Sequence, residues 1–382
     1  MKKILFTSLN DHVPWGGSEE LWSKVALHLS GTYKIAVLIK KWKNAPMQIG
    51  EFMENNVEVF YKPVNKEKIF IKVVLNKFKH KFGFKKNKLK NDFNSVKNIQ
   101  DFDLVVLSVG NHSDSKILEY TNYLKILNKS YLIVVQLATD LQYLDDNILL
   151  GLKEAYENAK GVCYLCEDNL KIIEMQFGFV LANKIKIDNP FNFGQNYVLP
   201  LEQQNYNVAC VASFTTFHKG QELLLRSISN QKWQERNIIF NLYGSGINEN
   251  QIRRLIKIYK LENKVNLKGY EPDINKIWKE NIVCIMPSRM EGQSLAMLEA
   301  MSFGRMVIST KVGDAQRLVK HNETGFLINA PTVEFIEIAL DQAWESRTNW
   351  VEMGKLSRKH LYDTIKKDSV IDFSEKLQIL LK

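Results

Sequence analysis

Long apolar runs, cysteines and prolines are all scarce in this chain, which has 4 cysteines and 8 prolines among 382 residues. No apolar stretch approaches the roughly 20 residues that a membrane-spanning helix needs. The N-terminus passes directly from Met1 and two lysines into a short apolar segment, without the cleavage site of a secretory signal peptide. We therefore expect a cytoplasmic protein, which can still rest on the inner face of the cell membrane.

The few candidate metal ligands do not form a convincing site. Cys163 and Cys166 form a C-x-x-C pair inside an apolar stretch that is typical of a buried strand. Residues three apart in a strand point to opposite faces, which argues against a redox or metal pair. Asp101 and Asp103 have a spacing that can hold a divalent metal, but they directly precede a buried strand and predict a turn at its entry. We expect no metal.

Acidic residues are outnumbered, with 42 against 52 lysines and arginines, so the formal net charge is +10. Such an excess predicts an anionic partner, which can be nucleotide phosphates, nucleic acid or a membrane surface. It is densest between Lys62 and Lys97, where 12 lysines and many apolar residues accompany 2 acidic residues. For this segment we favour contact with an anionic membrane over a merely solvated face, and we expect no nucleic acid.

The chain is long enough to bury two cores, and strand and helix patterns alternate along most of it. This alternation predicts an α/β fold with doubly wound parallel sheets. A polar stretch at residues 195–207 predicts a linker between an N-terminal domain, 1–194, and a C-terminal domain, 208–360. We expect a last helix at residues 361–382. Strands are predicted at residues 4–9, 34–39, 57–61, 104–109, 131–136, 162–166, 184–187, 208–212, 238–243, 265–267, 282–286, 307–309 and 326–328.

The most informative stretch is residues 287–304, where a loop carrying Glu291 follows an apolar strand and a helix begins near Gln293. The free amide groups and positive dipole end of that helix make an anion site. On a continuous ideal helix, Glu299 would lie about 12 Å along the axis and roughly 80° around it from Glu291. Two carboxylates that accept hydroxyl groups, with an anion site between them, suit a nucleotide-sugar.

Residues 291–301 (EGQSLAMLEAM) resemble the two-glutamate signature of retaining glycosyltransferases that have the two-Rossmann GT-B fold, and most of all their family four, the glycosyl transferases group 1. Residues 218–224 (HKGQELL) resemble the segment of that family in which a lysine, here Lys219, contacts the donor diphosphate. The loops at Gly244 and Tyr270 are similar to family segments beside the donor, the second of which lines the nucleobase pocket.

The resemblance implies transfer of a sugar, with retention, from a UDP- or GDP-sugar to a glycan or lipid-linked acceptor in bacterial surface-polysaccharide synthesis. It implies no cofactor, an acceptor-binding N-terminal domain, and a last helix that crosses back to it. Glu291, which would hold the transferred sugar, Lys219 and His112 are the implied catalytic residues. The implied donor-binding residues are Gly16, Gly17, Lys219, Gly244, Tyr270, Arg289, Glu291, Gly292, Gln293, Ser294, Leu295 and Glu299, the last on the ribose.

Two positions depart from the family pattern. The arginine expected about six residues before the phosphate-binding lysine is Ser213, for which Arg289 is a candidate replacement. The histidine expected after the strand at 131–136 is Gln136, which leaves His112 and His12 as alternatives. These departures keep two rivals open: a GT-B sugar-nucleotide epimerase or phosphorylase, and a non-catalytic protein that binds a nucleotide-sugar.

Overall fold

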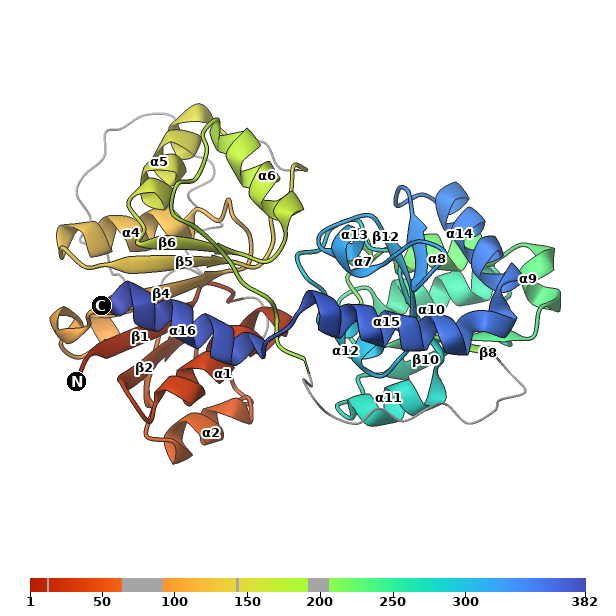
Figure 1. The fold of residues 1–382 in the computed structure, drawn as a ribbon, viewed down its shortest axis with the longest axis horizontal. Helices are drawn as coiled ribbons and strands as arrows, with labels where there is room; N and C mark the ends of the chain where they lie inside the picture. Colours follow the sequence, from red (N-terminus) through yellow and green to blue (C-terminus); the bar gives the residue numbers. More distant parts are fainter. Residues whose placement is uncertain (12–13, 64–91, 142–143, 192–205) are drawn as a thin grey trace, which may run out of the picture.

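Two lobes, each a parallel sheet covered by helices, lie side by side in the protein (Figure 1). The computed structural model describes residues 1–11, 14–63, 92–141, 144–191 and 206–382. The first domain has a seven-stranded sheet in the order β3-β2-β1-β4-β5-β6-β7, and the second has a six-stranded sheet in the order β10-β9-β8-β11-β12-β13. The two-domain α/β architecture that the sequence predicts is therefore confirmed.

The first domain alternates strands and helices as its apolar runs predict. Its strands are β1 (Lys3–Ser8), β2 (Lys34–Ile39), β3 (Glu58–Tyr61), β4 (Leu104–Val109), β5 (Tyr131–Val135), β6 (Gly161–Tyr164) and β7 (Lys184–Lys186). Its helices are α1 (Gly17–Leu29), α2 (Gln48–Glu54), α4 (Lys116–Ile126), α5 (Asp146–Glu157) and α6 (Glu167–Phe177), with short 3-10 turns at Asp92–Ser95 and Ile99–Asp101. Because helices cover both faces of the sheet, its central strands are mostly apolar and almost entirely buried.

The second domain repeats this pattern. Its strands are β8 (Tyr206–Val211), β9 (Ile238–Tyr243), β10 (Val265–Gly269), β11 (Val283–Met286), β12 (Met306–Thr310) and β13 (Gly325–Ile328). Its helices are α7 (Thr216–Lys219), α8 (Gln221–Ser227), α9 (Gln231–Glu235), α10 (Glu249–Ile258), α11 (Ile274–Glu280), α12 (Leu295–Ser302), α13 (Ala315–Leu318), α14 (Val333–Glu345) and α15 (Trp350–Thr364). A short 3-10 turn, Arg347–Asn349, lies between α14 and α15.

The strand orders locate a crevice in each domain. In the first sheet β1 lies between β2 and β4, and in the second sheet β8 lies between β9 and β11. At such a point the chain changes the direction in which it adds strands, so the loops on either side part and leave a crevice at the carboxyl ends of the strands. Ligands of open α/β sheets bind there, which directs attention to the loops after β1, β4, β8 and β11.

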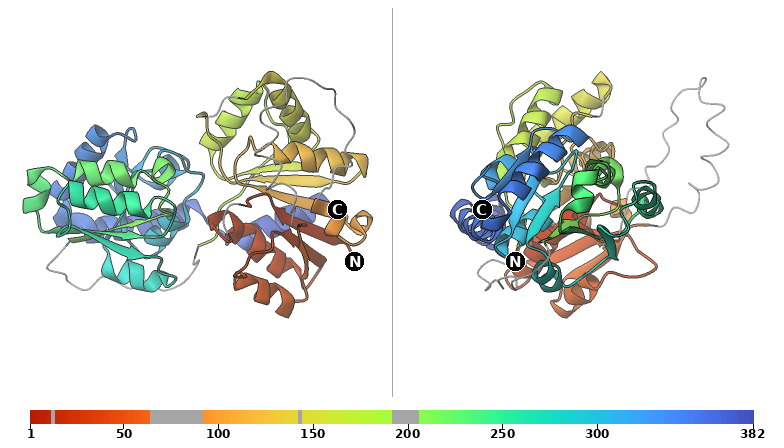
Figure 2. Two further views of the ribbon diagram at one scale, coloured as in Figure 1. Left: turned by 180° about the vertical axis from the view of Figure 1, so that it is seen from behind. Right: turned by 90° about the vertical axis from the view of Figure 1, so that its right-hand side faces the viewer.

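The last helix, α16 (Ser369–Leu381), returns from the second domain to the first and packs along α1 (Figures 1 and 2). Phe373 and Leu377 of α16 are buried in the same apolar cluster as Trp22 and Val25 of α1. The sequence prediction places this helix at residues 361–382, whereas α15 continues to Thr364 and α16 starts only at Ser369. Among the described residues no helix combines the length and apolar character needed to cross a bilayer.

Two sequence predictions fall largely outside the described residues. Most of the lysine-rich segment between Lys62 and Lys97 lies there, so its membrane contact stays a prediction, as does most of the linker at 195–207. Lys62 itself is buried, and its ammonium group lies 2.9 Å from Asp11 Oδ1 and donates to the carbonyl of Ser8 at 2.6 Å. It therefore fixes the loop after β1 and does not face a membrane.

Candidate functional site

A lysine–glutamate pair lies at the switch point of the second sheet. The loop after β8 leads through α7 to Lys219, and the loop after β11 carries Glu291. Lys219 Nζ lies 2.7 Å from Glu291 Oε1, which also accepts a hydrogen bond from Ser288 Oγ at 2.7 Å. The two side chains of the pair are 24% and 11% exposed, so both are held by protein and still reachable by a ligand. Two segments that the sequence singled out separately thus form one site.

Glycine makes this approach of the two loops possible. Gly220 ends α7 in the left-handed region at φ 67°, and a Cβ built on it would lie 2.0 Å from the carbonyl oxygen of Pro287. The backbone amide of Arg289 also donates to the carbonyl of His218 at 2.8 Å. The backbones of the two loops are therefore in direct contact, and this contact brings Lys219 to Glu291.

Arg289 has local partners that limit its use as the missing phosphate cation. Its guanidinium lies 2.5 Å from a carboxylate oxygen of Glu222 and donates to the carbonyl of Thr216 at 3.1 Å. The charge is thus paired within the second domain and braces α7. Ser213, which stands where the family has its arginine, accepts a hydrogen bond from Gln221 Nε2 through its backbone carbonyl at 2.8 Å.

The helix after the Glu291 loop begins later than the sequence predicts. α12 starts at Leu295, and Ser294 is its N-cap, with Oγ accepting a 3.4 Å hydrogen bond from the amide of Met297. Glu291 therefore lies in irregular structure, and placing it on one ideal helix with Glu299 is wrong. A serine at the N-cap accepts a hydrogen bond from one of the free amides at the start of a helix. Ser294 is therefore the residue in the sequence that indicates where α12 begins.

The loop after Glu291 packs directly against the first domain. A Cβ on Gly292 would lie 2.1 Å from the carbonyl oxygen of Gln136 and 3.3 Å from Asn169 Nδ2, both in the first domain. A Cβ on Gly17, at the start of α1, would lie 3.1 Å from Leu295 Cδ1. These glycines let the two domains close on each other beside the candidate site.

Gln293 connects the two domains instead of facing open space. It is buried, and its Nε2 donates to Asp188 at 2.6 Å and to Asp314 at 2.7 Å, while Asn189 Nδ2 donates to its carbonyl at 2.7 Å. Arg317 bridges the same two aspartates. The pKa of Asp188 is lowered because Lys186 and Arg317 outweigh the effect of burial. Sequence reasoning missed this interdomain network, since Asp188 and Asn189 lie more than 100 residues from Gln293 in the chain and meet it only in the folded protein.

The two neighbouring glutamates at the start of α1 have different environments. Glu19 is buried, and its carboxylate accepts hydrogen bonds from Ser8 Oγ at 2.9 Å and from the amide of Gly16 at 3.0 Å. It holds the Gly16 turn as part of a capping box. Glu20 is half-buried and accepts a hydrogen bond from Trp15 Nε1 at 3.0 Å.

Glu299 faces this same helix. Burial, and secondarily the charge of Glu20, raise the pKa of Glu299 to about 7, against a smaller opposite effect of Lys24. In the part of the chain that the structure describes, no hydrogen bond or ion pair engages the Glu299 carboxylate, whose residue is only half-buried. A bound hydroxyl group would meet an unused acceptor there.

His112 lies inside the first domain. It is fully buried, its ring nitrogens lie 2.7 Å from Asn111 Oδ1 and 2.6 Å from Gln176 Oε1, and burial lowers its pKa. In this arrangement the ring is occupied and has no surface to offer a substrate, which argues against the predicted catalytic role. Gln136, in contrast, is next to Gly292, and its buried Nε2 lacks a hydrogen-bond partner among the described atoms, as does Asn169 Nδ2.

The two remaining loops of the predicted donor site differ in character. Gly244 has φ 141°, and a Cβ on it would lie 2.0 Å from the carbonyl oxygen of Ala212, so its loop packs tightly on the loop after β8. Tyr270 follows β10 and is 76% exposed, which leaves its ring available to a ligand. His12, an alternative to His112, lies outside the described residues.

The structure describes the cysteine pair and the Asp-x-Asp, the two motifs for which the sequence analysis considers a metal. Cys163 and Cys166 are buried free cysteines. Lys3 contacts both aspartates of the Asp-x-Asp, through Nζ to Asp101 at 2.8 Å and through its amide to Asp103 at 2.8 Å, at the start of β1. Within the described ranges, no three His, Cys, Asp or Glu side chains gather in a way that could hold a metal ion.

Residues 205–345 match the model of the family described as glycosyl transferases group 1. The second domain belongs to the glycosyl transferases group 1. Relatives of the chain include an uncharacterized glycosyltransferase of Haemophilus influenzae, 27% identical over 187 residues, which are 47% of this chain and 51% of the relative. A poly(ribitol-phosphate) alpha-N-acetylglucosaminyltransferase of Staphylococcus aureus is 25% identical over 239 residues, or 60% of this chain and 46% of the relative. The chain thus spans about half the length of these relatives.

Solved structures extend the likeness of the group 1 domain to the whole fold. Anabaena HepE in complex with UDP superposes with a TM-score of 0.73 at 16% identity, over 100% of this chain and 99% of HepE. A TarM variant of S. aureus in complex with Fondaparinux, alpha-GlcNAc-glycerol and UDP gives a TM-score of 0.71 at 16% identity, over 100% of both chains. The predicted GT-B fold, a pair of Rossmann-like domains, is confirmed.

Proposed function

We propose that this chain transfers a sugar from a UDP-sugar to a glycan or lipid-linked acceptor, with retention of the anomeric configuration and without a metal ion or other cofactor. The observation that carries the proposal is the 2.7 Å pair of Lys219 and Glu291 at the switch point of the group 1 domain. UDP is favoured over GDP because several of the similar solved structures are complexes with UDP or UDP-glucose. Relatives named as transferases favour a transferase over an epimerase or a binding protein.

The pair suits the charge changes of glycosyl transfer. As the bond from the sugar C1 to the diphosphate breaks, negative charge grows on the leaving phosphate oxygen. The Lys219 ammonium has three donors, so it can keep its bond to Glu291 and donate to that oxygen as well. The acceptor hydroxyl then bonds to C1 from the same face, and its proton passes to the leaving diphosphate. Glu291, already fixed by Ser288, can accept hydrogen bonds from hydroxyls of the transferred sugar.

Glu299 is proposed to hold the ribose of the donor. Its half-buried carboxylate has no hydrogen bond or ion pair among the described residues, and two ribose hydroxyls would supply the missing donors. Each hydroxyl would also favour the ionised form, so binding of the nucleotide should lower the pKa of Glu299 from about 7. Tyr270, which is exposed beside β10, is the proposed contact of the base.

The biological setting is proposed by analogy with named relatives. Besides the S. aureus enzyme, a putative colanic acid biosynthesis glycosyltransferase of Escherichia coli is 29% identical over 121 residues. The first name concerns poly(ribitol-phosphate) and the second colanic acid biosynthesis. By analogy, we propose that this chain acts in surface-polysaccharide synthesis in the cytoplasm, at the inner face of the membrane. Membrane contact through the segment between Lys62 and Lys97 is part of this proposal.

A thermal-shift panel with UDP, GDP and ADP tests the donor site. The intact chain is compared with Lys219→Met and Glu299→Gln, and with Lys320→Met as the matched control, since Lys320 makes a surface pair with Glu323. We expect UDP to raise Tm in the intact chain and the control, and to raise it much less in the two site variants. If no nucleotide raises Tm in the intact chain at millimolar concentration, or if all variants respond alike, the proposed site is wrong.

A further inference from the structure

The loop that carries Glu291 has no regular secondary structure to hold it. Between β11 and α12, residues 287–294 depend on side-chain and loop contacts for their shape. Gly292 follows Glu291 directly, and only glycine fits there, because a Cβ would lie 2.1 Å from the carbonyl oxygen of Gln136. A glycine also leaves the backbone beside the carboxylate unusually free to rotate. The position of the Glu291 side chain therefore depends on contacts on both sides of Gly292.

Part of this support comes from the second domain itself. The amide of Asp314 donates to the carbonyl of Gly292 at 2.9 Å. Gly313, at φ 58°, lies so close that a Cβ on it would be 2.2 Å from the same carbonyl oxygen. Before the glutamate, Thr310 Oγ1 donates to the carbonyl of Ser288 at 2.6 Å. The backbone of the loop is thus fixed at two points by β12, which pairs with β11, and by the residues that follow β12.

The first domain supplies further support through Gln293. The Nε2 of this buried side chain donates to Asp188 Oδ1 at 2.6 Å and to Asp314 Oδ2 at 2.7 Å, and its Oε1 accepts from the backbone amide of Asn189. Asn189 Nδ2 also donates to the backbone carbonyl of Gln293 at 2.7 Å. A buried polar side chain whose donors and acceptor are all engaged is held rigidly. Asp188 and Asn189 provide all of these hydrogen bonds except the one to Asp314.

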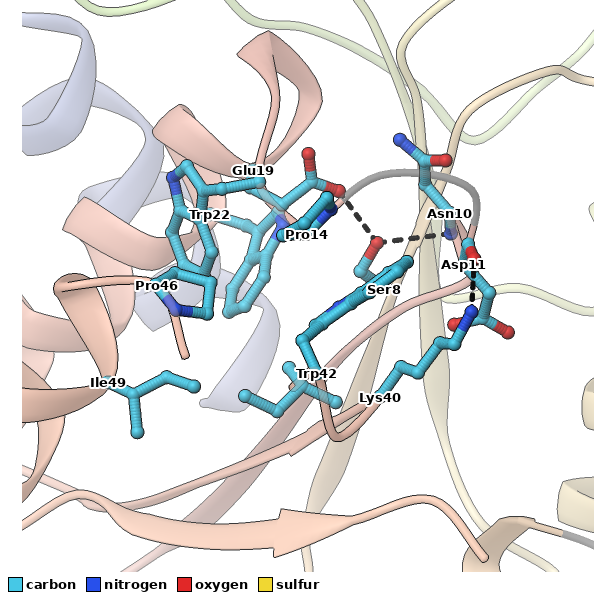
Figure 3. A pocket seen from close by; sticks show the side chains of 12 residues that line it. Ser8, Asn10, Asp11, Pro14, Glu19, Trp22, Lys40, Trp42, Pro46 and Ile49 are labelled. Carbon is cyan, nitrogen blue, oxygen red and sulfur yellow. Dashed lines mark hydrogen bonds between the residues drawn. The ribbon is translucent and has the colours of Figure 1, made fainter. Parts of the chain in front are cut away.

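A second contact with the first domain lies at the start of α12. A Cβ on Gly17 would lie 3.1 Å from Leu295 Cδ1, so α1 begins directly against this residue. The turn before α1 is itself fixed, because the Glu19 carboxylate accepts a hydrogen bond from Ser8 Oγ at 2.9 Å (Figure 3) and one from the amide of Gly16 at 3.0 Å. The first domain therefore contacts both the end of the loop and the helix that follows it.

We propose that Asp188 and Asn189 are positioning residues for sugar transfer, which place the Glu291 carboxylate against the donor sugar by fixing Gln293. They act through Gln293 and do not touch the substrate. Because they belong to the first domain, Glu291 has its working geometry only while the two domains are docked. A displacement of about 1 Å at such a group costs on the order of a hundredfold in rate. Lys219 is held separately at the end of α7, so binding of the diphosphate does not need this support. The inference rests on the proposed function.

Kinetics and titration of the full chain separate positioning from binding. Release of UDP from UDP-glucose and UDP-N-acetylglucosamine, with water as the acceptor, gives kcat and KM, and calorimetric titration gives the Kd of UDP. The variants are Gln293→Met, Asp188→Leu and the conservative Asp188→Asn, which keeps an oxygen that can accept from Gln293. Arg236→Gln is the matched control, because it breaks an ion pair with Asp341 just before β9, at the edge of the sheet opposite to the Glu291 loop.

We expect Gln293→Met and Asp188→Leu to lower kcat about a hundredfold, while KM and the Kd of UDP change less than about threefold. Asp188→Asn should keep kcat within about tenfold of the parent chain, because it loses only the charge of the acceptor. Arg236→Gln should lower Tm and leave kcat unchanged. The inference is overturned if kcat is unchanged in Gln293→Met and Asp188→Leu, or if it falls only in proportion to a loss of UDP binding.

Hydrogen exchange of the backbone amides of residues 288–294 tests the same support without any turnover. We expect exchange in this segment to be about tenfold faster or more in Gln293→Met and Asp188→Leu, and unchanged in Arg236→Gln. Unchanged exchange in the first two variants would show that Asp188 and Gln293 do not hold the loop, whether or not the chain is active. A parent chain that releases no UDP from either donor contradicts the proposed function instead, and with it the role of the loop in sugar transfer.

Discussion

The raised pKa of the Glu299 carboxyl group should make the free energy of unfolding depend on pH. Its pKa is raised to about 7, chiefly by burial and then by Glu20, while Lys24 acts in the opposite direction. Glu20 and Lys24 lie on α1 of the first domain, whereas Glu299 lies on α12 of the second. The contributions of Glu20 and Lys24 to this pKa therefore depend on α1 remaining next to α12.

The sign and size of the effect follow from this pKa. Because the folded-state pKa exceeds the ordinary value of 4.5, ionising Glu299 costs more free energy in the folded protein than in the unfolded chain. The cost is absent below about pH 4.5, grows as the pH rises, and is complete above about pH 7. At ~1.36 kcal/mol per pKa unit, ionised Glu299 lowers the free energy of unfolding by about 3 kcal/mol.

Glu299→Gln, which cannot ionise, should therefore gain stability relative to the parent chain as the pH rises. The assay is urea unfolding followed by tryptophan fluorescence, from about pH 4.5 to about pH 8.5, in the absence of nucleotide. We expect a small difference at the acidic end and a gain of about 3 kcal/mol at the alkaline end. Glu352→Gln, which removes an exposed carboxylate on α15, is the control. A difference for Glu299→Gln that does not grow with pH refutes the raised pKa of Glu299 in the folded protein.

Three further variants test the site and the closure of the domains. Lys219→Met should weaken UDP binding about tenfold to a hundredfold in a titration, because it removes one charge-assisted hydrogen bond and leaves Glu291 without its cation. Gly292→Ala should abolish glycosyl transfer by forcing the domains apart, whereas Gly31→Ala, where a Cβ meets nothing within 4 Å, should not. Arg317→Gln should reduce the free energy of unfolding by about 2 kcal/mol in urea, because it removes the cation that bridges two aspartates.

Most of the fold is predictable from local patterns. The apolar runs that become β4, β5 and β11 are buried on both faces, so they mark strands without any tertiary information. The closeness of Lys219 and Glu291 is also predictable, because each residue follows a strand, and the carboxyl ends of parallel strands meet at one edge of the sheet. The sequence prediction starts α12 near Gln293, whereas the helix begins at Leu295, directly after its N-cap Ser294.

The parts that the sequence does not reveal depend on contacts between distant segments. The His112 ring lies 2.6 Å from Gln176 Oε1, which is 64 residues away in the chain, and no local pattern distinguishes a buried histidine from one in a cleft. Gln293 is predicted beside the donor, but its side chain donates to Asp314 in its own domain and to Asp188, which it reaches only because the two domains meet.

The central claim, that the chain transfers a sugar from a UDP-sugar with retention, is tested most directly by following its action on UDP-glucose and UDP-N-acetylglucosamine by proton NMR. Water can take the place of the acceptor hydroxyl, so the assay does not require an identified acceptor. We predict release of UDP and of a free sugar that first appears in the anomeric form of the donor, with much slower release by Lys219→Met. A chain that binds UDP but releases none from either donor, or a sugar that first appears in the opposite anomeric form, would contradict the account.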